Sequence, residues 1–526
     1  MRLRSPPAEP EDFSGSLFPF PPSTLFTSEG DTTMLEAAAG ALVQLFTPYY
    51  FMLFIVGIFL GLITGIIPGV GGTVALALIL PFTMKLEPAE ALPLVIGLVS
   101  PVLTSDSIPA ILIGAPGSAS AAATMMDGFP MAKRGEAGRA LGIAFTASAI
   151  GGVFGAVLIA VSIPILKPLV LFFETPEFLA LSVLAISSVA ILSGGSILKG
   201  IGTAGIGLLL AMIGEDPIRF VPRWNFGIDY LLNSISVIPV AMGLFAIPEL
   251  LETCIAGTSI ANVSKESMRG RREGLMDVLR EWKLVLSSSG IAAFIGFLPG
   301  LGSTVSTWIC YTWSMLTSRD KSSFGKGEIR GVVGCEAANN ASAGGAMIPT
   351  IAFGVPGSTV TALILVVFWA VGINPGPKLM TDHLDLVYLI IWSVALANII
   401  GAAICYLATN KLAMLTKVPA HILAPLVMTV IVAGTLYATA SVGGIVILIC
   451  TGILGWFMKS LGWPRPVFLL AFILGPVIER FYFHSVMMYN YAWLLRPAVI
   501  VILVCSFGII YLGWKIQGKA THTGGA

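Results

Sequence analysis

Long apolar stretches make up most of the chain, and few polar residues separate them. A membrane-spanning helix needs about 20 mainly apolar residues. Stretches that approach this length are predicted as full spans, near 43–67, 139–166, 177–193, 198–214, 230–253, 283–299, 385–411, 421–440, 443–461, 466–484 and 496–514. Shorter, interrupted apolar pieces form two clusters, one in each half, at 73–84, 89–104, 108–115, 118–127, 301–316, 333–354 and 358–373. The pattern predicts an all-α polytopic membrane protein with about 11 full spans plus half-helices.

Composition supports a protein of the lipid bilayer. Of the 526 residues, 56% are hydrophobic and 11% are charged, whereas an ordinary soluble protein has about 25% charged residues. A net charge of +1 gives no reason to expect a nucleic-acid partner. The six cysteines and four histidines show no metal-ligand spacing. The phosphate-cradling and nucleophile motifs of enzymes are not found, so we expect no cofactor, no transition metal and no catalysis.

The chain divides into five predicted segments. Residues 1–33 are rich in Pro, Ser and acidic residues and are expected to be a disordered tail. A first membrane repeat covers 34–253, and a second repeat with a final helix covers 283–514. The basic stretch 254–282 between them is predicted to be a cytoplasmic linker, and 515–526 a cytoplasmic tail.

Two short motifs occur once in each half, in the same order. "GIIPGVGGT" (65–73) returns as "GFLPGLGST" (296–304), and "IPAILIGAPGS" (108–118) returns as "IPTIAFGVPGS" (348–358) with seven of eleven positions identical. The chain is therefore predicted to be an internal duplication.

Charge placement predicts that the two repeats are inverted. The loop 131–140 carries three basic residues, but its counterpart 376–383 carries one. The loop 318–330 carries four, but its counterpart around Lys85 carries one. Because Lys and Arg mark cytoplasmic ends, equivalent loops are expected on opposite faces. This places the N-terminus outside and the C-terminus inside.

The motifs interrupt helices with Pro-Gly pairs and then place a Ser or Thr at the start of the next helix. Backbone breaks at membrane depth are tolerated where they line a cavity or lie inside protein. Four helix N-termini are expected to converge near the midplane, where their N–H groups and positive dipole ends favour an anion. The stretches 51–84, 91–132, 284–318 and 331–377 contain no Lys or Arg. The predicted substrate-binding residues are Pro68, Gly69, Gly71, Gly72, Thr73, Gly117, Ser118, Gly300, Ser303, Thr304, Asn339, Asn340, Gly357, Ser358 and Thr359.

Three polar residues near the motifs are candidates for coupling to H⁺ or Na⁺: Asp106, Glu336 and Asn340. Acids inside a membrane segment are functional hypotheses by default. Alternatively, Asp106 caps the helix that starts near Ile108, and Glu336 is a packed or capping acid. The other expected roles are structural: helix packing for Gly57, Gly61 and Gly65, interfacial anchoring for Glu249, Glu479 and Arg480, and a turn or cap for Asp127.

Several stretches together resemble the large membrane subunit of tripartite tricarboxylate transporters, the TctA family. They are "GIIPGVGG", "AILIGAPGSASAAATMMDGFPMAKRGEAGRAL", "EAANNASAGGAMIPTIAFGVPGS" and "GINPGP", and the resemblance runs from about Met34 to the last span. It implies an ion-gradient-driven importer of organic carboxylates in the bacterial inner membrane. It also implies two partners, a periplasmic solute-binding protein and a small four-span membrane subunit. Residues 102–109, "VLTSDSIP", depart from the family pattern, which leaves the carboxylate undetermined. A stand-alone carrier or an anion channel is the alternative.

Overall fold

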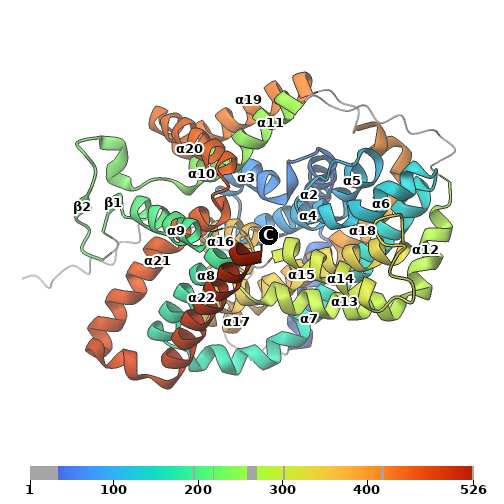
Figure 1. Ribbon diagram of the computed structural model, residues 1–526. Helices are drawn as coiled ribbons and strands as arrows, with labels where there is room; N and C mark the ends of the chain where they lie inside the picture. The colour runs from blue at the N-terminus through green and yellow to red at the C-terminus, as the bar shows by residue number, and fades with distance from the viewer. Residues whose placement is uncertain are drawn as a thin grey trace, which may run out of the picture.

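The computed structural model describes residues 34–192, 196–216, 218–256, 269–299, 302–415 and 420–523, and these residues are mainly helical (Figure 1). The predicted tail 1–33, part of the linker and Gly300 lie outside the described residues. The last helix, α22 (Pro497–Thr523), runs through most of the predicted tail 515–526.

The first half begins with α1 and α2, which separate at Phe46–Thr47 within the single predicted span 43–67. Its π-helical turn η2 lies between α10 and α11, and a small hairpin of β1 and β2 precedes them. The elements are α1 (Met34–Leu45), α2 (Pro48–Ile66), α3 (Gly71–Thr83), α4 (Pro88–Ser105), α5 (Ser107–Ile113), α6 (Ala122–Lys133), α7 (Ala137–Phe172), α8 (Thr175–Leu192), α9 (Ile197–Ala211), β1 (Gly214–Glu215), β2 (Pro222–Arg223), η1 (Asp229–Asn233), α10 (Val237–Ala241), η2 (Met242–Ala246) and α11 (Ile247–Ala256).

The second half repeats this order after the linker helix α12. The predicted piece 333–354 corresponds to α15, which is one continuous helix despite Pro349 within it and ends before Gly354. The elements are α12 (Arg271–Arg280), α13 (Trp282–Phe297), α14 (Gly302–Leu316), α15 (Ile329–Phe353), α16 (Thr359–Ala370), α17 (Pro377–Thr381), α18 (Leu384–Leu415), α19 (Ala420–Thr439), α20 (Val442–Ser460), α21 (Arg465–Tyr489) and η4 (Asn490–Leu495), followed by α22.

Helices of the two halves exchange partners in a matched way. In chain order α4 and α7 of the first half correspond to α15 and α18 of the second. The helix α4 packs on α18, and α15 packs on α7. The same exchange occurs farther along, where α21 packs on α9 and α20 packs on η2. The helices therefore form two groups that each draw on both halves, visible on opposite sides of Figure 1. The helices α3 and α16 connect the groups, since α3 also contacts α19 and α16 contacts α21.

Glycines allow the closest helix crossings. A Cβ at Gly57 or Gly61 would begin 2.3 Å or 2.1 Å from a backbone oxygen of α4. Glycine is therefore required for α2 to lie on α4 at this spacing, and the prediction that these glycines pack helices is confirmed.

Six helices in the described part of the chain are long and apolar enough to cross a membrane. They are Pro48–Ile66, Pro88–Ile113, Ala137–Phe172, Leu384–Leu415, Val442–Ser460 and Arg465–Leu495. Several other predicted spans correspond to shorter apolar helices, among them Ile197–Ala211 and Trp282–Phe297. The count of about 11 full spans and the inverted orientation of the halves stay predictions.

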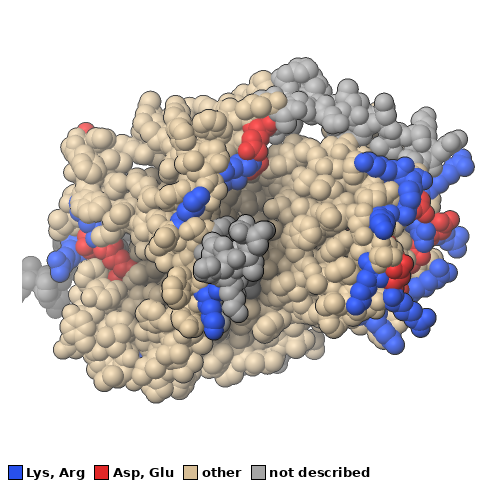
Figure 2. Space-filling view, viewed as in Figure 1, with Lys and Arg blue, Asp and Glu red and all other residues tan. Residues whose placement is uncertain are grey.

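Basic side chains gather at one end of the molecule (Figure 2). There the loop before α7 meets the loop before α15, because Arg134 donates to the carbonyl oxygens of Lys326 and Gly327 at 2.8 Å and 2.7 Å. The linker helix α12 joins them through an ion pair of 2.7 Å between Arg139 and Asp277. The three most basic connections therefore lie on one face.

Candidate functional site

The repeated motifs adopt repeated backbone conformations. Gly71 and Gly302 have φ of 50° and 57°, and Gly114 and Gly354 have φ of 68° and 64°. These values lie in the left-handed region, which glycine enters without steric cost. Gly71 and Gly302 stand where a turn leads into α3 and α14, respectively. Gly114 and Gly354 directly follow the last residues of α5 and α15. The glycines of the motifs thus create the interruptions that the sequence predicts.

All four motif copies meet at one cavity of about 410 Å³. This volume is within the range of ligand pockets, about 300–1,000 Å³. The first turns of α3 and α14 contribute to its wall, as do the start of α16 and the turn that precedes α6. The predicted site residues that line it are Gly69, Gly71, Gly72, Thr73, Ser118, Ser303, Thr304, Ser358 and Thr359.

Only one of the motif hydroxyls is a true N-cap. Ser358 caps α16, where its Oγ accepts from the Thr361 N–H at 3.2 Å and its own N–H donates to Thr361 Oγ1 at 2.9 Å. This capping box fixes the start of α16 at the cavity. The other motif hydroxyls start no helix as caps: Thr73, Ser303 and Thr304 lie inside the first turns of their helices, and α6 begins after Ala121 rather than at Ser118.

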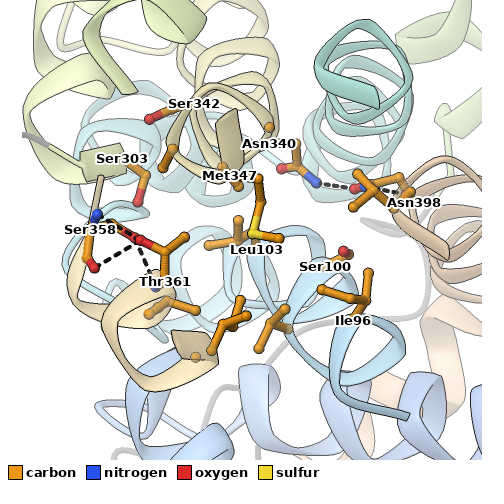
Figure 3. A pocket seen from close by; sticks show the side chains of 18 residues that line it. Ile96, Ser100, Leu103, Ser303, Asn340, Ser342, Met347, Ser358, Thr361 and Asn398 are labelled. Carbon is orange, nitrogen blue, oxygen red and sulfur yellow. Dashed lines mark hydrogen bonds between the residues drawn. The ribbon is translucent and has the colours of Figure 1, made fainter. Parts of the chain in front are cut away.

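A second, smaller cavity of about 60 Å³ adjoins the first and shares Gly72, Ser303 and Ser358 with it (Figure 3). It holds at most a few waters, because each needs about 10–15 Å³ by this measure. Asn340 lies at its edge and donates to Asn398 Oδ1 at 2.6 Å and to Thr104 Oγ1 at 3.0 Å. The smaller cavity is thus too small for an organic substrate, and Asn340 lines this cavity rather than the larger one.

The two candidate acids are fully buried in different surroundings. Asp106 is the single residue between α4 and α5, and its Oδ2 accepts a hydrogen bond from Ser118. It makes no side-chain cap at α5, so the capping alternative is wrong. Glu336 in α15 accepts from Thr124 at 2.6 Å and from Ser148 at 2.7 Å, one hydroxyl for each oxygen.

Four predicted site residues lie away from both cavities. Gly117 and Gly357 lie behind the wall, where a Cβ would begin 2.3 Å from the Gly65 carbonyl oxygen and 2.6 Å from that of Gly296. These two glycines allow their backbone to pass close to the ends of α2 and α13. Pro68 is in the turn between α2 and α3. Asn339 is buried and donates to the Leu103 carbonyl at 3.0 Å.

Glu249 in α11 is a wall residue that the sequence did not suggest. It accepts from Arg465 at 2.9 Å and from Lys459 at 2.8 Å. Among the described residues that line the larger cavity, it is the one charged side chain. Its partners come from α20 and the start of α21, more than 200 residues away. The sequence predicted Glu249 to be an interfacial anchor. Its place in the cavity wall was missed, because no local sequence pattern connects it to the motifs.

Two further polar residues have roles that sequence reasoning missed. Asp127 lies inside α6 rather than in a turn, and its carboxylate accepts from the N–H groups of Gly327 and Glu328 and from Tyr311. It thus anchors the loop that leads into α15 of the other half, whereas Glu328 is the N-cap of that helix. Asn398 is a buried amide in the apolar middle of α18, and Gly152 of α7 leaves space for it. An amide in an apolar span was a usable signal.

The larger cavity has the chemistry of an anion site without fixed basic side chains in its wall. The N-termini of α3, α14 and α16 contribute free N–H groups and the positive ends of their dipoles. Hydroxyls of Thr73, Ser118, Ser303 and Thr359 add polar contacts. Contacts of this kind hold a carboxylate and also release it, as a carrier requires.

Apolar helices, paired motifs and a polar cavity at broken helices define a multi-pass α-helical membrane protein. The sequence from residue 51 to 470 matches the family described as "Tripartite tricarboxylate transporter TctA family", and the chain belongs to this family. The resemblance predicted from the motifs is confirmed.

Two curated relatives come from Agrobacterium vitis. The "Uncharacterized 52.8 kDa protein in TAR-I ttuC' 3'region" is 31% identical over 444 residues, which cover 82% of this chain and 86% of that protein. The "Uncharacterized protein in TAR-II ttuC' 3'region" is 30% identical over 188 residues, 36% of this chain and 78% of that protein. No solved structure matches the chain.

Proposed function

We propose that this chain is the large permease subunit of a binding-protein-dependent tripartite system that imports organic carboxylates. The family is one of transporters. The observation that carries the proposal is the meeting of three helix N-termini and several hydroxyls in one cavity of about 410 Å³ with no Lys or Arg in its described lining. Di- and tricarboxylates are the substrates that fit this chemistry.

The transport step is driven by an H⁺ or Na⁺ gradient in this proposal. Asp106, Glu336 and Asn340 are the coupling candidates. The partners are a periplasmic solute-binding protein that delivers the carboxylate and a small four-span membrane subunit. The location is the bacterial inner membrane, with the N-terminus in the periplasm and the C-terminus in the cytoplasm.

The loop contacts support inverted repeats. The loops before α7 and α15 touch through Arg134, although they are not equivalent positions in the two halves. From that basic face, three crossings by α7, α8 and α9 bring the β1–β2 hairpin to the periplasm. Two further contacts each join segments that this alternation of crossings puts on one side of the membrane. Lys199, near the start of α9, donates to the Leu461 carbonyl after α20 at 2.6 Å. Arg496, before α22, pairs with Glu174 and Glu177 at 2.5 Å and 2.7 Å.

The cavity faces the cytoplasm under this topology. Its wall beyond the motifs includes Phe245 of η2, Glu249 of α11, and Pro464 and Pro466 around the start of α21. Alternation places both segments near the cytoplasmic side. The contacts of α3 with α19 and of α16 with α21 close the opposite side. Movement of one helix group against the other then exposes the cavity alternately to each side.

Counterflow uptake in proteoliposomes tests the proposal. The chain is reconstituted with its small subunit, its binding protein is added, and labelled mono-, di- and tricarboxylates are compared under separate H⁺ and Na⁺ gradients. Saturable uptake that depends on the binding protein is expected. Uptake of no carboxylate by folded protein would contradict the proposal, and a current that does not saturate would indicate a channel.

A further inference from the structure

The carboxyl group of Asp106 has one oxygen without a partner. The residue is fully buried, and Ser118 donates to its Oδ2. Its Oδ1 has no hydrogen-bond partner among the described residues. An ionised carboxylate inside a membrane protein is costly unless something positive balances it. The described surroundings of Asp106 contribute hydroxyls and an amide, with no basic side chain bonded to it.

Other oxygens surround this carboxyl. The Asn339 carboxamide lies beside Asp106, is 1% exposed, and has an Oδ1 without a partner. Ser120 Oγ lies 2.8 Å from Ser118 Oγ and is also buried. Two buried acceptors without a described partner, Asp106 Oδ1 and Asn339 Oδ1, and the hydroxyls of Ser118 and Ser120 therefore lie together around the Asp106 carboxyl. Buried acceptors without a donor are costly, and carboxylate, hydroxyl and carboxamide oxygens are ligands for a hard cation.

The end of α2 adds a negative dipole to the same position. A Cβ at Gly117 would begin 2.3 Å from the carbonyl oxygen of Gly65 and 2.8 Å from the Cα of Asp106. The last turn of α2 thus ends against the segment that carries Asp106 and Ser118. Helix C-termini and unwound carbonyls are the groups that coordinate Na⁺ in carriers with broken helices.

The second half contains the same backbone but lacks the acid. Gly357 approaches Gly296 and Ala346 as Gly117 approaches Gly65 and Asp106, so Ala346 holds the position of Asp106. Val360 stands where the first half has Ser120. Ser358, the counterpart of Ser118, is occupied in the capping box of α16. The duplicated site has therefore diverged between the halves.

We propose that the protein binds one Na⁺, at the position of Asp106 and not at that of its counterpart Ala346, between Asp106, Ser118 and Ser120 of the first half and Asn339 of α15. The equivalent position of the second half, with Ala346 and Ser358, faces the carboxylate instead. Glu336 is not part of the cation site, because each of its oxygens already accepts from a hydroxyl. The use of this ion to drive uptake rests on the proposed function, but its binding does not.

Direct binding of ²²Na⁺ to the purified full-length chain, with no carboxylate present, tests the cation site. One ion per chain is expected, with no loss of bound ²²Na⁺ to excess K⁺. Asp106→Asn retains an acceptor for Ser118 and should weaken Na⁺ binding at least about tenfold, the loss that even outer partners of metal sites cause. Glu177→Gln, a matched change at a buried acid that pairs with Arg496 away from both cavities, should leave the stoichiometry and affinity for Na⁺ unchanged. If Asp106→Asn unfolds, Ser120→Ala replaces it with the same expectation.

Several results would overturn the inference. They are two ions per chain, no bound Na⁺, or equal Na⁺ affinity in the wild-type chain and the Asp106 or Ser120 variant. Proton uptake on lowering the pH in place of Na⁺ binding would assign Asp106 to a proton instead. Because no carboxylate is present, these outcomes do not depend on the uptake experiment. If Na⁺ binds but no carboxylate is taken up, the cation site stands and the proposed transport function fails.

Discussion

At the scale of single residues, the Ser358 side chain has a structural role and is also predicted to contact the substrate. Its hydroxyl caps α16, and the residue lines both cavities. Ser358→Ala removes the cap, which costs about 0.5–2 kcal/mol of stability, and also removes a hydroxyl from the site. The KM for carboxylate uptake should rise severalfold while the protein stays folded.

Ser441→Ala is the matched control for this prediction. Ser441 caps α20 by accepting from Gly443 at 3.1 Å and lines neither cavity. It should lower thermal stability to a similar extent and leave the KM unchanged. An unchanged KM in both variants would remove Ser358 from the site.

At the scale of elements, the sequence predicted what depends on local chemistry. Pro-Gly breaks, positive-φ glycines such as Gly71 and Gly354, and the order of repeated motifs follow from short stretches. The helix α15 matches the predicted piece 333–354 and continues through Pro349, which is tolerated inside a helix that neighbours enclose. The roles of Glu249 and Asp127 were missed, since their partners come from distant segments that only packing brings together.

The contact of Asp127 with the start of α15 yields an element-scale prediction. Asp127→Ala leaves the N–H groups of Gly327 and Glu328 and the Tyr311 hydroxyl without their acceptor. Each buried donor left unpaired costs about 1–3 kcal/mol. The melting temperature in detergent should fall by several degrees, and trypsin should cut the preceding loop faster at Lys321 or Lys326.

Asp320→Ala, in the same loop, is the control. Its carboxylate bonds to Ser322 within the exposed loop. Its melting temperature should stay close to that of the wild type. Equal effects of the two substitutions would show that Asp127 does not anchor α15.

At the scale of the whole molecule, the exchange of helix partners between halves and the basic face of the described residues are what the proposed inverted topology predicts. In a chain whose six cysteines are replaced, single cysteines at Lys133, Lys326 and Phe220 report the side of each loop. Phe220, in the β1–β2 hairpin, is 70% exposed. Impermeant thiol reagents should label Phe220→Cys in intact cells, and Lys133→Cys and Lys326→Cys only after permeabilisation. Labelling of Lys326→Cys from outside would contradict inverted repeats.

The central claim is that the carboxylate binds where the four motif copies meet. The most direct measurement is the labelling rate of a single cysteine at Ser303, which lines both cavities, with and without carboxylate. A transported di- or tricarboxylate should slow the labelling in a saturable manner and should leave labelling of a cysteine at Ser441 unchanged. Labelling of Ser303→Cys that is unaffected by every transported carboxylate would contradict the account.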